Sequence, residues 1–288
     1  LLFCGSETSG KVTTALELAR VLMCSKKTAD WSCDCPACRQ NRLLENPYLL
    51  LLGWRNFEDE ILATADVLKR SESEAAKFLF VRAVRKLEKR FDGVLWEGAE
   101  NRISSAAGMI EDIEESMEPL LPGSSADESG KRAKAIDRVV ELSENLIKKG
   151  TTAGIPVHQV RKTSYWTYTT PGQKVVILEN ADKMMPASAN ALLKTLEEPP
   201  VDTFFILLAS NKENIIPTLR SRLRHFQFRV RSAALQEEII RRVFRDDSGN
   251  YDSLESFFLS WGLRQDLVEG AGKSFLQAVR EKKPHAFF

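Results

Sequence analysis

Long apolar runs and a strong excess of either charge are absent from this sequence of 288 residues. No stretch reaches the roughly 18 consecutive apolar residues that suggest a membrane-spanning helix, and the N-terminus lacks the pattern of a secretion signal. The formal net charge is only +1, so a general electrostatic attraction to nucleic acid is excluded and any DNA contact has to be local. These absences predict a cytoplasmic protein that does not enter a membrane.

Cysteine and histidine are scarce, with five and three residues respectively. No nucleophile is grouped with a histidine and a carboxylate in a way that would indicate a serine or cysteine hydrolase. Four of the cysteines nevertheless fall within fifteen residues: Cys24, Cys33, Cys35 and Cys38. In a reducing compartment such clustering favours metal binding over disulfides. Cys4 stands apart in an apolar run, which favours a place in the core.

The stretch "GSETSGKVTT" at residues 5–14 has the Gly-x4-Gly-Lys spacing of a phosphate-binding loop. It follows an apolar run and opens an amphipathic pattern, which is the strand–loop–helix context that such a loop requires. Gly5, Gly10 and Lys11 are therefore candidate nucleotide-binding residues. Val12 stands where these loops carry Ser or Thr, and valine has no lone pair to offer Mg²⁺. The sequence predicts the loop without its metal ligand.

Apolar runs alternate with helical patterns in the first and last thirds of the chain. Helices are expected at residues 11–24 and 186–198, the second ended by two prolines. Strands are expected at residues 1–4, 46–54, 174–178 and 203–210. The alternation predicts an α/β fold with a mostly parallel sheet of the P-loop NTPase type. Beyond Arg229 the pattern is helical again, which predicts a small C-terminal helical domain over 229–288.

The middle of the chain differs, because it is highly charged and helical in pattern; it predicts a helical insertion over 54–153. A capping box from Ser71 to Glu74 would open one of its helices, "SESEAAKFLFVRAVRKLEKRF", whose apolar residues share one face. The basic residues of this helix could meet phosphates, but interspersed glutamates favour a solvated face. They are Arg82, Arg85, Lys86, Lys89 and Arg90.

A second motif of the nucleotide site, an acidic one, is expected after the strand "KVVIL". In a working ATPase of this class that strand ends in Asp-Glu, where the Asp serves the metal and the Glu activates the attacking water. Here the residues are Glu179 and Asn180. Glu179 could still face a cation, but the amide of Asn180 cannot accept a proton. Together with Val12, this predicts that the chain does not hydrolyse ATP by itself.

Two arginines, Arg220 and Arg222, lie in "IIPTLRSRLRHFQF", in a short turn expected between strands. Taken alone, such arginines favour surface salt bridges. The surrounding residues carry a resemblance, however. "KVVILENADKMMPASANALLKTLEEPP" followed by "FFILLASNKENIIPTLRSRL" closely resembles the AAA+ clamp-loader subunits of bacterial DNA polymerase III. The resemblance covers residues 1–53 and 154–228, and the degenerate motifs are most similar to those of the delta-prime subunit.

The resemblance implies roles for particular residues. Ser221-Arg222-Leu223 matches the first two positions of the family's Ser-Arg-Cys motif, so Arg222 is expected to reach a neighbouring subunit's ATP in trans, with Arg220 in support. The four clustered cysteines are expected to bind a structural Zn²⁺ at 24–38, although Cys33-x-Cys35 is tighter than the family's step. Residues 1–228 would form the AAA+ core and 229–288 the lid. A collar domain would follow in a longer natural chain.

The partners implied are the gamma/tau and delta subunits and, through the complex, the sliding clamp and primer–template DNA. ATP or ADP binding by the degenerate loop stays open, as does the role of the insertion. Two alternatives also stay open. The chain could be an ATP-hydrolysing gamma/tau-like subunit, or a nucleotide-independent interaction module that uses the zinc knot and the insertion to recruit a partner.

Overall fold

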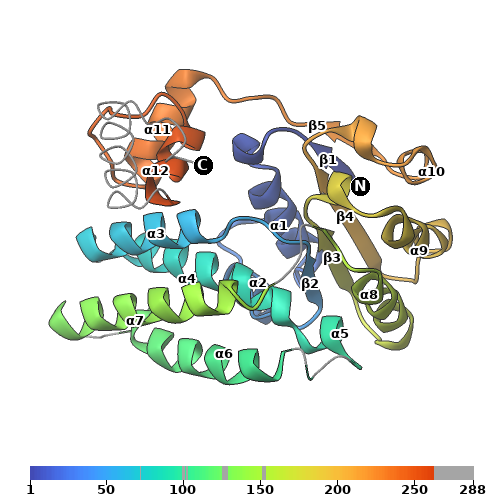
Figure 1. Ribbon diagram of the computed structural model, residues 1–288, viewed down its shortest axis with the longest axis horizontal. Coiled ribbons are helices and arrows are strands. Elements are labelled where there is room, and N and C mark those ends of the chain that lie inside the picture. Colours follow the sequence, from blue (N-terminus) through green and yellow to red (C-terminus); the bar gives the residue numbers. More distant parts are fainter. Residues whose placement is uncertain (72, 99–100, 102, 125–128, 151–153, 263–288) are drawn as a thin grey trace, which may run out of the picture.

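The computed structural model describes residues 1–288 except 72, 99–100, 102, 125–128, 151–153 and 263–288. Its centre is a five-stranded, all-parallel sheet in the order β2-β3-β4-β1-β5 (Figure 1). The strands are β1 (Leu2–Cys4), β2 (Leu49–Leu52), β3 (Lys174–Leu178), β4 (Thr203–Ala209) and β5 (His225–Gln227). The predicted α/β class and parallel sheet are confirmed.

Strands β2 and β3 are buried on both faces, which explains why they read as continuous apolar runs. Alternate side chains enter two separate cores. Leu50 and Val176 face a cluster that includes residues of α8 (Val157–Thr169) and α9 (Pro186–Glu197). Leu49 and Val175 face the other cluster, together with α1 (Lys11–Leu22). The sheet is therefore covered by helices on both sides.

The remaining elements of this α/β part are short. Helix α2 (Pro36–Arg42) follows the cysteine-rich segment, and α10 (Pro217–Arg220) precedes β5. The 3₁₀ helices are η1 (Glu7–Ser9), η5 (Ala181–Lys183) and η6 (Lys212–Asn214). Both η1 and η5 directly follow strands, at the carboxyl edge of the sheet, where ligands bind in open α/β folds.

The segment between β2 and α8 is helical, as predicted (Figure 1). Its elements are α3 (Glu58–Arg70), α4 (Glu74–Glu88), η2 (Lys89–Phe91), α5 (Gly93–Trp96), α6 (Ser104–Met117), η4 (Glu118–Leu120) and α7 (Ser129–Ile147). The expected capping box is wrong by two residues. Ser73, not Ser71, caps α4, because its Oγ accepts a hydrogen bond from the backbone N–H of Ala76 at 3.3 Å.

The predicted solvated face of α4 is also wrong. Arg85, Lys86 and Arg90 are buried, with at most 9% of each residue exposed. Arg85 pairs with Glu45 at 2.7 Å and with Glu114 at 2.9 Å. The apolar periodicity was a sound guide to the core, since Phe80 and Leu87 are fully buried, but the opposite face meets carboxylates from other elements rather than water.

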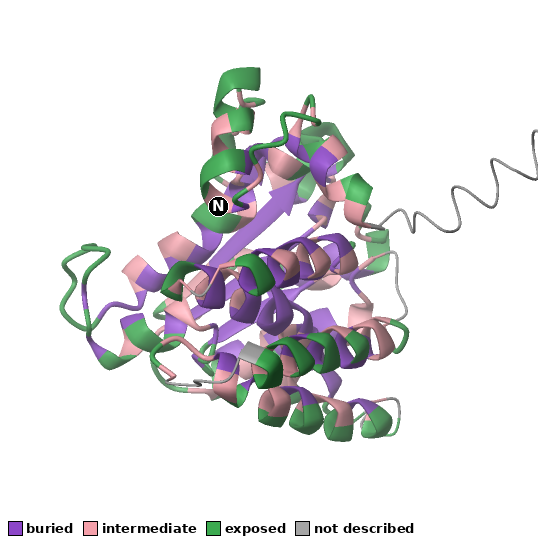
Figure 2. Cartoon of the chain, turned by 90° about the vertical axis from the view of Figure 1, so that its left-hand side faces the viewer, coloured by how far each residue is buried: buried purple, intermediate pink, exposed green. Residues whose placement is uncertain are grey.

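Two C-terminal helices follow: α12 (Leu254–Gly262) packs against α3, and α11 (Ala233–Val243) packs against α12 (Figure 1). We call α11 and α12 the lid helices. Their apolar residues belong to the same core cluster as those of α3, α4, α6 and α7. The burial pattern in Figure 2 follows this arrangement, with buried residues in the sheet and exposed ones on the outer helices. The further helical stretch expected over 267–283 lies outside the described residues, and the predicted domain boundaries stay predictions.

Among the residues that the structure describes, no helix is long and apolar enough to span a bilayer.

Candidate functional site

The phosphate loop joins β1 to α1 at the carboxyl edge of the sheet, where the sequence placed it. Lys11 is buried, and its Nζ donates to the carbonyl oxygens of Gly5 at 2.9 Å and Ser6 at 2.8 Å. The lysine that would contact phosphate is thus bonded to the loop itself. Burial lowers the pKa of Lys11 below its usual range, and Arg55 adds to this while Glu7 and Glu179 oppose it.

Gly10 adopts a left-handed conformation with φ of 89°, which favours glycine. A second constraint acts at this position, because a Cβ on Gly10 would collide with the guanidinium of Arg231. Arg231 also donates to the carbonyl oxygen of Thr8. The segment that leads to the lid helices therefore rests directly on the phosphate loop. No feature of the sequence pointed to Arg231.

Glu179 follows β3 at the same edge of the sheet, in the place where P-loop ATPases keep an acid for Mg²⁺. We call this place the metal position. Glu179 is 4% exposed, and Arg90 of η2 pairs with its Oε1. The Nε of Arg55 lies 3.6 Å from its Oε2. Burial alone would raise the pKa of Glu179, but the charges of Arg90 and Arg55 hold it below its usual value.

The two arginines belong to a larger network whose members are buried or partly buried. Arg55 also pairs with Glu60, and the Nζ of Lys86 lies 2.5 Å from the other oxygen of that carboxylate. Burial would raise the pKa of Glu60, but the charges of Lys86 and Arg55 outweigh it and hold the pKa at about 2. Three cations thus surround two carboxylates, so the cluster retains a net positive charge.

Asn180, the residue after Glu179, has a structural role. Its φ of 53° is left-handed, a conformation that Asn tolerates better than most residues. Its Nδ2 donates to the carbonyl oxygen of Trp54 at 2.8 Å. Gly53 allows this close approach, since its φ is 92° and a Cβ there would collide with the carbonyl oxygen of Glu179. The amide therefore ties the end of β3 to the end of β2.

Arg220 ends α10, and Arg222 follows it shortly before β5. Strand β5 pairs in parallel with β1, so the two arginines lie toward the amino edge of the sheet, whereas the phosphate loop leaves β1 at the carboxyl edge. The side chain of Arg222 is 35% exposed; its Nη2 lies 2.5 Å from Glu197, and its Nη1 donates to the carbonyl oxygen of Thr218 at 2.7 Å. Arg220 pairs with Glu213. Within this chain both arginines make surface ion pairs. Their expected action in trans stays a prediction.

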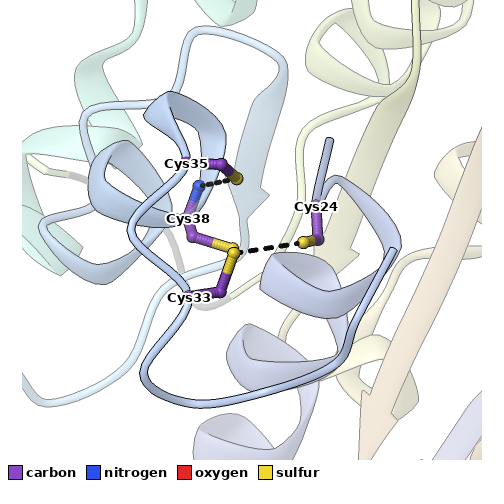
Figure 3. A group of neighbouring side chains, drawn as sticks. All are labelled: Cys24, Cys33, Cys35 and Cys38. Carbon is purple, nitrogen blue, oxygen red and sulfur yellow. Dashed lines mark hydrogen bonds between the residues drawn. The ribbon is translucent and has the colours of Figure 1, made fainter. Parts of the chain in front are cut away.

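The four clustered cysteines converge, as predicted (Figure 3). All are buried free thiols, and their sulfur atoms lie within 4.8 Å of one another. Cys35 caps the start of α2, where its Sγ accepts from the N–H of Cys38 at 3.4 Å. The sulfurs of Cys24 and Cys33 are 3.6 Å apart. The cluster could hold a metal ion, and the short Cys33–Cys35 step does not prevent the convergence.

Backbone donors favour ionised thiols at two of the four positions, Cys24 and Cys35. A backbone hydrogen bond from Thr28 lowers the pKa of Cys24 to about 7. Burial opposes ionisation of Cys35, but backbone N–H groups of Cys38 and Ser25 hold its pKa at about 6. Thiolates are the form that binds metal. Cys38 differs, because burial raises its pKa to about 12, so a cation would have to displace the proton of that thiol.

Arg20 supports the cysteine cluster from α1. It is 1% exposed, pairs with Glu17 at 2.5 Å and donates to the Sγ of Cys38 at 3.2 Å. Its guanidinium also lies 5.6 Å from the ring centroid of Trp31, as a cation–π contact. Sequence reasoning missed Arg20, because its position on α1 shows no pattern that links it to a cysteine eighteen residues later.

Comparisons with known proteins agree with the resemblance found in the sequence. A family profile described as "DNA polymerase III, delta subunit" matches residues 120–232. The DNA polymerase III subunit delta' of Escherichia coli (strain K12) is 30% identical over 162 residues, which are 52% of this chain and 43% of that protein. Subunit delta' of Pseudomonas aeruginosa is 40% identical over 76 residues, or 26% of this chain and 23% of that protein.

A gamma subunit is also similar. The DNA polymerase III subunit gamma of Buchnera aphidicola subsp. Schizaphis graminum is 33% identical over 99 residues, or 33% of this chain and 27% of that protein. The chain spans less than half the length of each of these relatives. The comparisons confirm the resemblance found in the sequence, to a clamp-loader subunit of DNA polymerase III that is most like delta-prime.

Proposed function

We propose that this chain is a delta-prime-like subunit of the DNA polymerase III clamp loader, which helps to load the sliding clamp onto primer–template DNA without hydrolysing ATP itself. Its partners would be the gamma/tau and delta subunits of the same complex. The similarity to delta-prime subunits supports the family role. The near-neutral charge fits a subunit whose own DNA contact is local.

The observation that carries the proposal is the state of Glu179. Its two carboxylate oxygens face Arg90 and Arg55 instead of an open metal position. Asn180 is bonded to backbone, and Val12 offers no oxygen. A magnesium ion would have to displace a buried guanidinium and would still lack two protein groups that the reaction uses. This combination favours a subunit that contributes to ATP hydrolysis elsewhere.

A gamma/tau-like ATPase is the competing function, and the similarity to gamma subunits favours it in part. It would require Glu179 to leave Arg90 and a substitute for the hydroxyl missing at Val12. Measurement of ATP turnover by the purified chain with Mg²⁺ separates the two. We expect no turnover above a Lys11→Ala control, whereas steady hydrolysis that Lys11→Ala abolishes would establish the ATPase instead.

In the proposed complex, Arg222 would stabilise the charge that develops on a neighbouring subunit's ATP. An arginine supplied in trans is worth about 10³–10⁵ in rate. Its exposed position, with Glu197 and Thr218 orienting the guanidinium, supports this role. Reconstitution with gamma/tau and delta subunits provides the test. Arg222→Ala should lower the turnover at the neighbouring site by about 10³-fold, whereas Arg242→Ala, which removes a lid arginine paired with Glu238, should not.

The same experiment addresses the third reading, a nucleotide-independent interaction module. Such a module would assemble with the other subunits yet leave their ATP turnover unchanged when Arg222 is replaced. Equal turnover of wild-type and Arg222→Ala complexes would therefore contradict the action in trans and favour the module.

We propose Zn²⁺ as the ion for the cysteine cluster. Four thiolates around Zn²⁺ at about 2.3 Å place their sulfurs roughly 3.8 Å apart, and the 3.6 Å between Cys24 and Cys33 is close to this value. Cys35 and Cys38 would complete the set. Four protein ligands leave no open coordination position, so the metal would order the segment from 24 to 38 and take no part in a reaction.

A further inference from the structure

We propose that the helical insertion is a built-in substitute for magnesium-bound nucleotide: it neutralises the metal position at one end and holds the lid helices at the other. This gives a function to the segment whose role the sequence left open. The inference deepens the proposed function and rests on it in one respect, the loss of magnesium chemistry at Glu179. It does not depend on Arg222.

The first end of this device is electrostatic. A carboxylate at the carboxyl edge of the sheet normally faces a divalent cation, but here the cations are guanidinium groups of the chain itself. Arg90 comes from η2 and Arg55 from the residues between β2 and α3, so both belong to the insertion. The cluster of Arg55, Lys86 and Arg90 with Glu60 and Glu179 is already net positive, which disfavours the entry of a further cation.

Phe57 joins this end to α3. It is 1% exposed, and its ring contacts both guanidinium groups, with centroid distances of 5.2 Å to Arg55 and 5.4 Å to Arg90. Phe57 is also the residue that directly precedes the first turn of α3. The start of α3 is therefore fixed at the metal position by cation–π contacts as well as by ion pairs.

The far end of α3 holds the lid helices. Arg70, the last residue of α3, donates to the carbonyl oxygens of Arg245 at 2.7 Å and Phe244 at 3.2 Å. These carbonyls lie at the C-terminus of α11, where a helix leaves acceptors unpaired and its dipole favours a cation. Phe257 of α12 is fully buried in the core cluster that α3 shares.

A single helix thus connects the metal position with the lid helices. Helix α3 has 13 residues, which corresponds to about 20 Å. A third contact closes the arrangement, because Arg231, just before α11, lies against Gly10 and Thr8 of the phosphate loop. Protein side chains therefore hold the acid at position 179, the lid helices and the phosphate loop.

The test measures hydrogen exchange of backbone amides in the purified full-length chain, over residues 233–243 and 254–258 of the lid helices. Wild type should exchange at the same rate with and without millimolar ATP and Mg²⁺. Arg70→Ala should speed exchange in these segments about tenfold, because two helix-terminal acceptors lose a charged donor. Arg242→Ala is the matched control, since Arg242 is on the lid but its side chain is 72% exposed and pairs with Glu238 of the same helix.

Arg55→Ala tests whether a change at the start of α3 alters hydrogen exchange in the lid helices at its far end. Its side chain is 23% exposed and the Arg90–Glu179 pair remains, so the chain should still fold. Faster exchange in the lid helices, at the opposite end of α3, supports the proposal. Wild-type rates in the lid of both Arg70→Ala and Arg55→Ala would overturn it, as would slower lid exchange of the wild type on addition of ATP and Mg²⁺. Because no neighbouring subunit is present, a failed Arg222 experiment leaves this result unaffected.

Discussion

The buried pair of Arg90 and Glu179 supports a quantitative prediction. Replacement of Arg90 by Met removes the positive charge and leaves a carboxylate that is 4% exposed with Arg55 as its nearest cation, at 3.6 Å. Loss of one partner of a buried ion pair costs about 3–5 kcal/mol. Since domains are stable by about 5–15 kcal/mol, a large share of the folding free energy would be lost. We expect the urea midpoint to fall by roughly 1 M or more.

The double variant Arg90→Met/Glu179→Gln isolates the pair itself. Without a charge at position 179 there is no unpaired carboxylate, so the double variant should recover at least about 2 kcal/mol relative to the sum of the two single losses. Urea unfolding followed by circular dichroism measures all four proteins. Arg138→Met is the control, because the Arg138–Glu141 pair on α7 is exposed and should contribute less than about 1 kcal/mol.

The pH dependence of the unfolding free energy tests the direction of the pKa shift of Glu179. In the wild type, the lowered pKa of Glu179 adds stability above the ordinary pKa of 4.5 and this stability is lost as the pH falls. In Arg90→Met, burial would instead raise the pKa of Glu179. The destabilisation relative to the wild type should therefore shrink as the pH falls toward 5. A cost below about 1 kcal/mol, or single losses that simply add, would refute the reasoning.

Two further predictions concern the metal site and the loss of stability at low pH. Cys38→Ser should abolish the single equivalent of zinc that atomic emission would detect in protein purified without chelator, and should lower the melting temperature; equal zinc in both proteins would contradict the assigned ligands. Glu60, with its pKa at about 2, should contribute up to about 3 kcal/mol above pH 4.5 that is lost between pH 4.5 and 2. In urea unfolding between pH 5 and 3, the stability of Glu60→Gln should lack this acid dependence. If its stability fell with pH as in the wild type, Glu60 would be excluded as the source.

The sequence was sufficient for the α/β architecture, because the strands of a parallel sheet are buried on both faces and read as apolar runs. The phosphate loop and the convergence of the cysteines were also predictable, since each depends on residues close together in the chain. For the same reason the apolar face of α4 was correct: Phe80 and Leu87 lie about two helical turns apart, on one face, and both are buried.

The charged residues were not predictable in the same way. Arg85, Lys86 and Arg90 have the spacing of an exposed face, and only the fold brings Glu45, Glu60 or Glu179 to them. A carboxylate 89 positions from Arg90 in the chain leaves no periodic trace in its neighbourhood. Arg231 illustrates the same limit, because its contact with Thr8 depends on how the two ends of the α/β part meet.

The order of strands in the sheet explains how the fold accommodates the long helical segment between β2 and α8. Strand β2 lies at an edge of the described sheet and pairs with β3 alone, in unbroken register from Leu49↔Val175 to Leu52↔Leu178. Parallel neighbours always need a crossover, and the entropy of closing a loop grows only slowly with its length. Lengthening this one connection therefore changes no other strand pairing. Domains of this kind can gain a new layer of helices at the β2–β3 crossover while the rest of the chain keeps its topology.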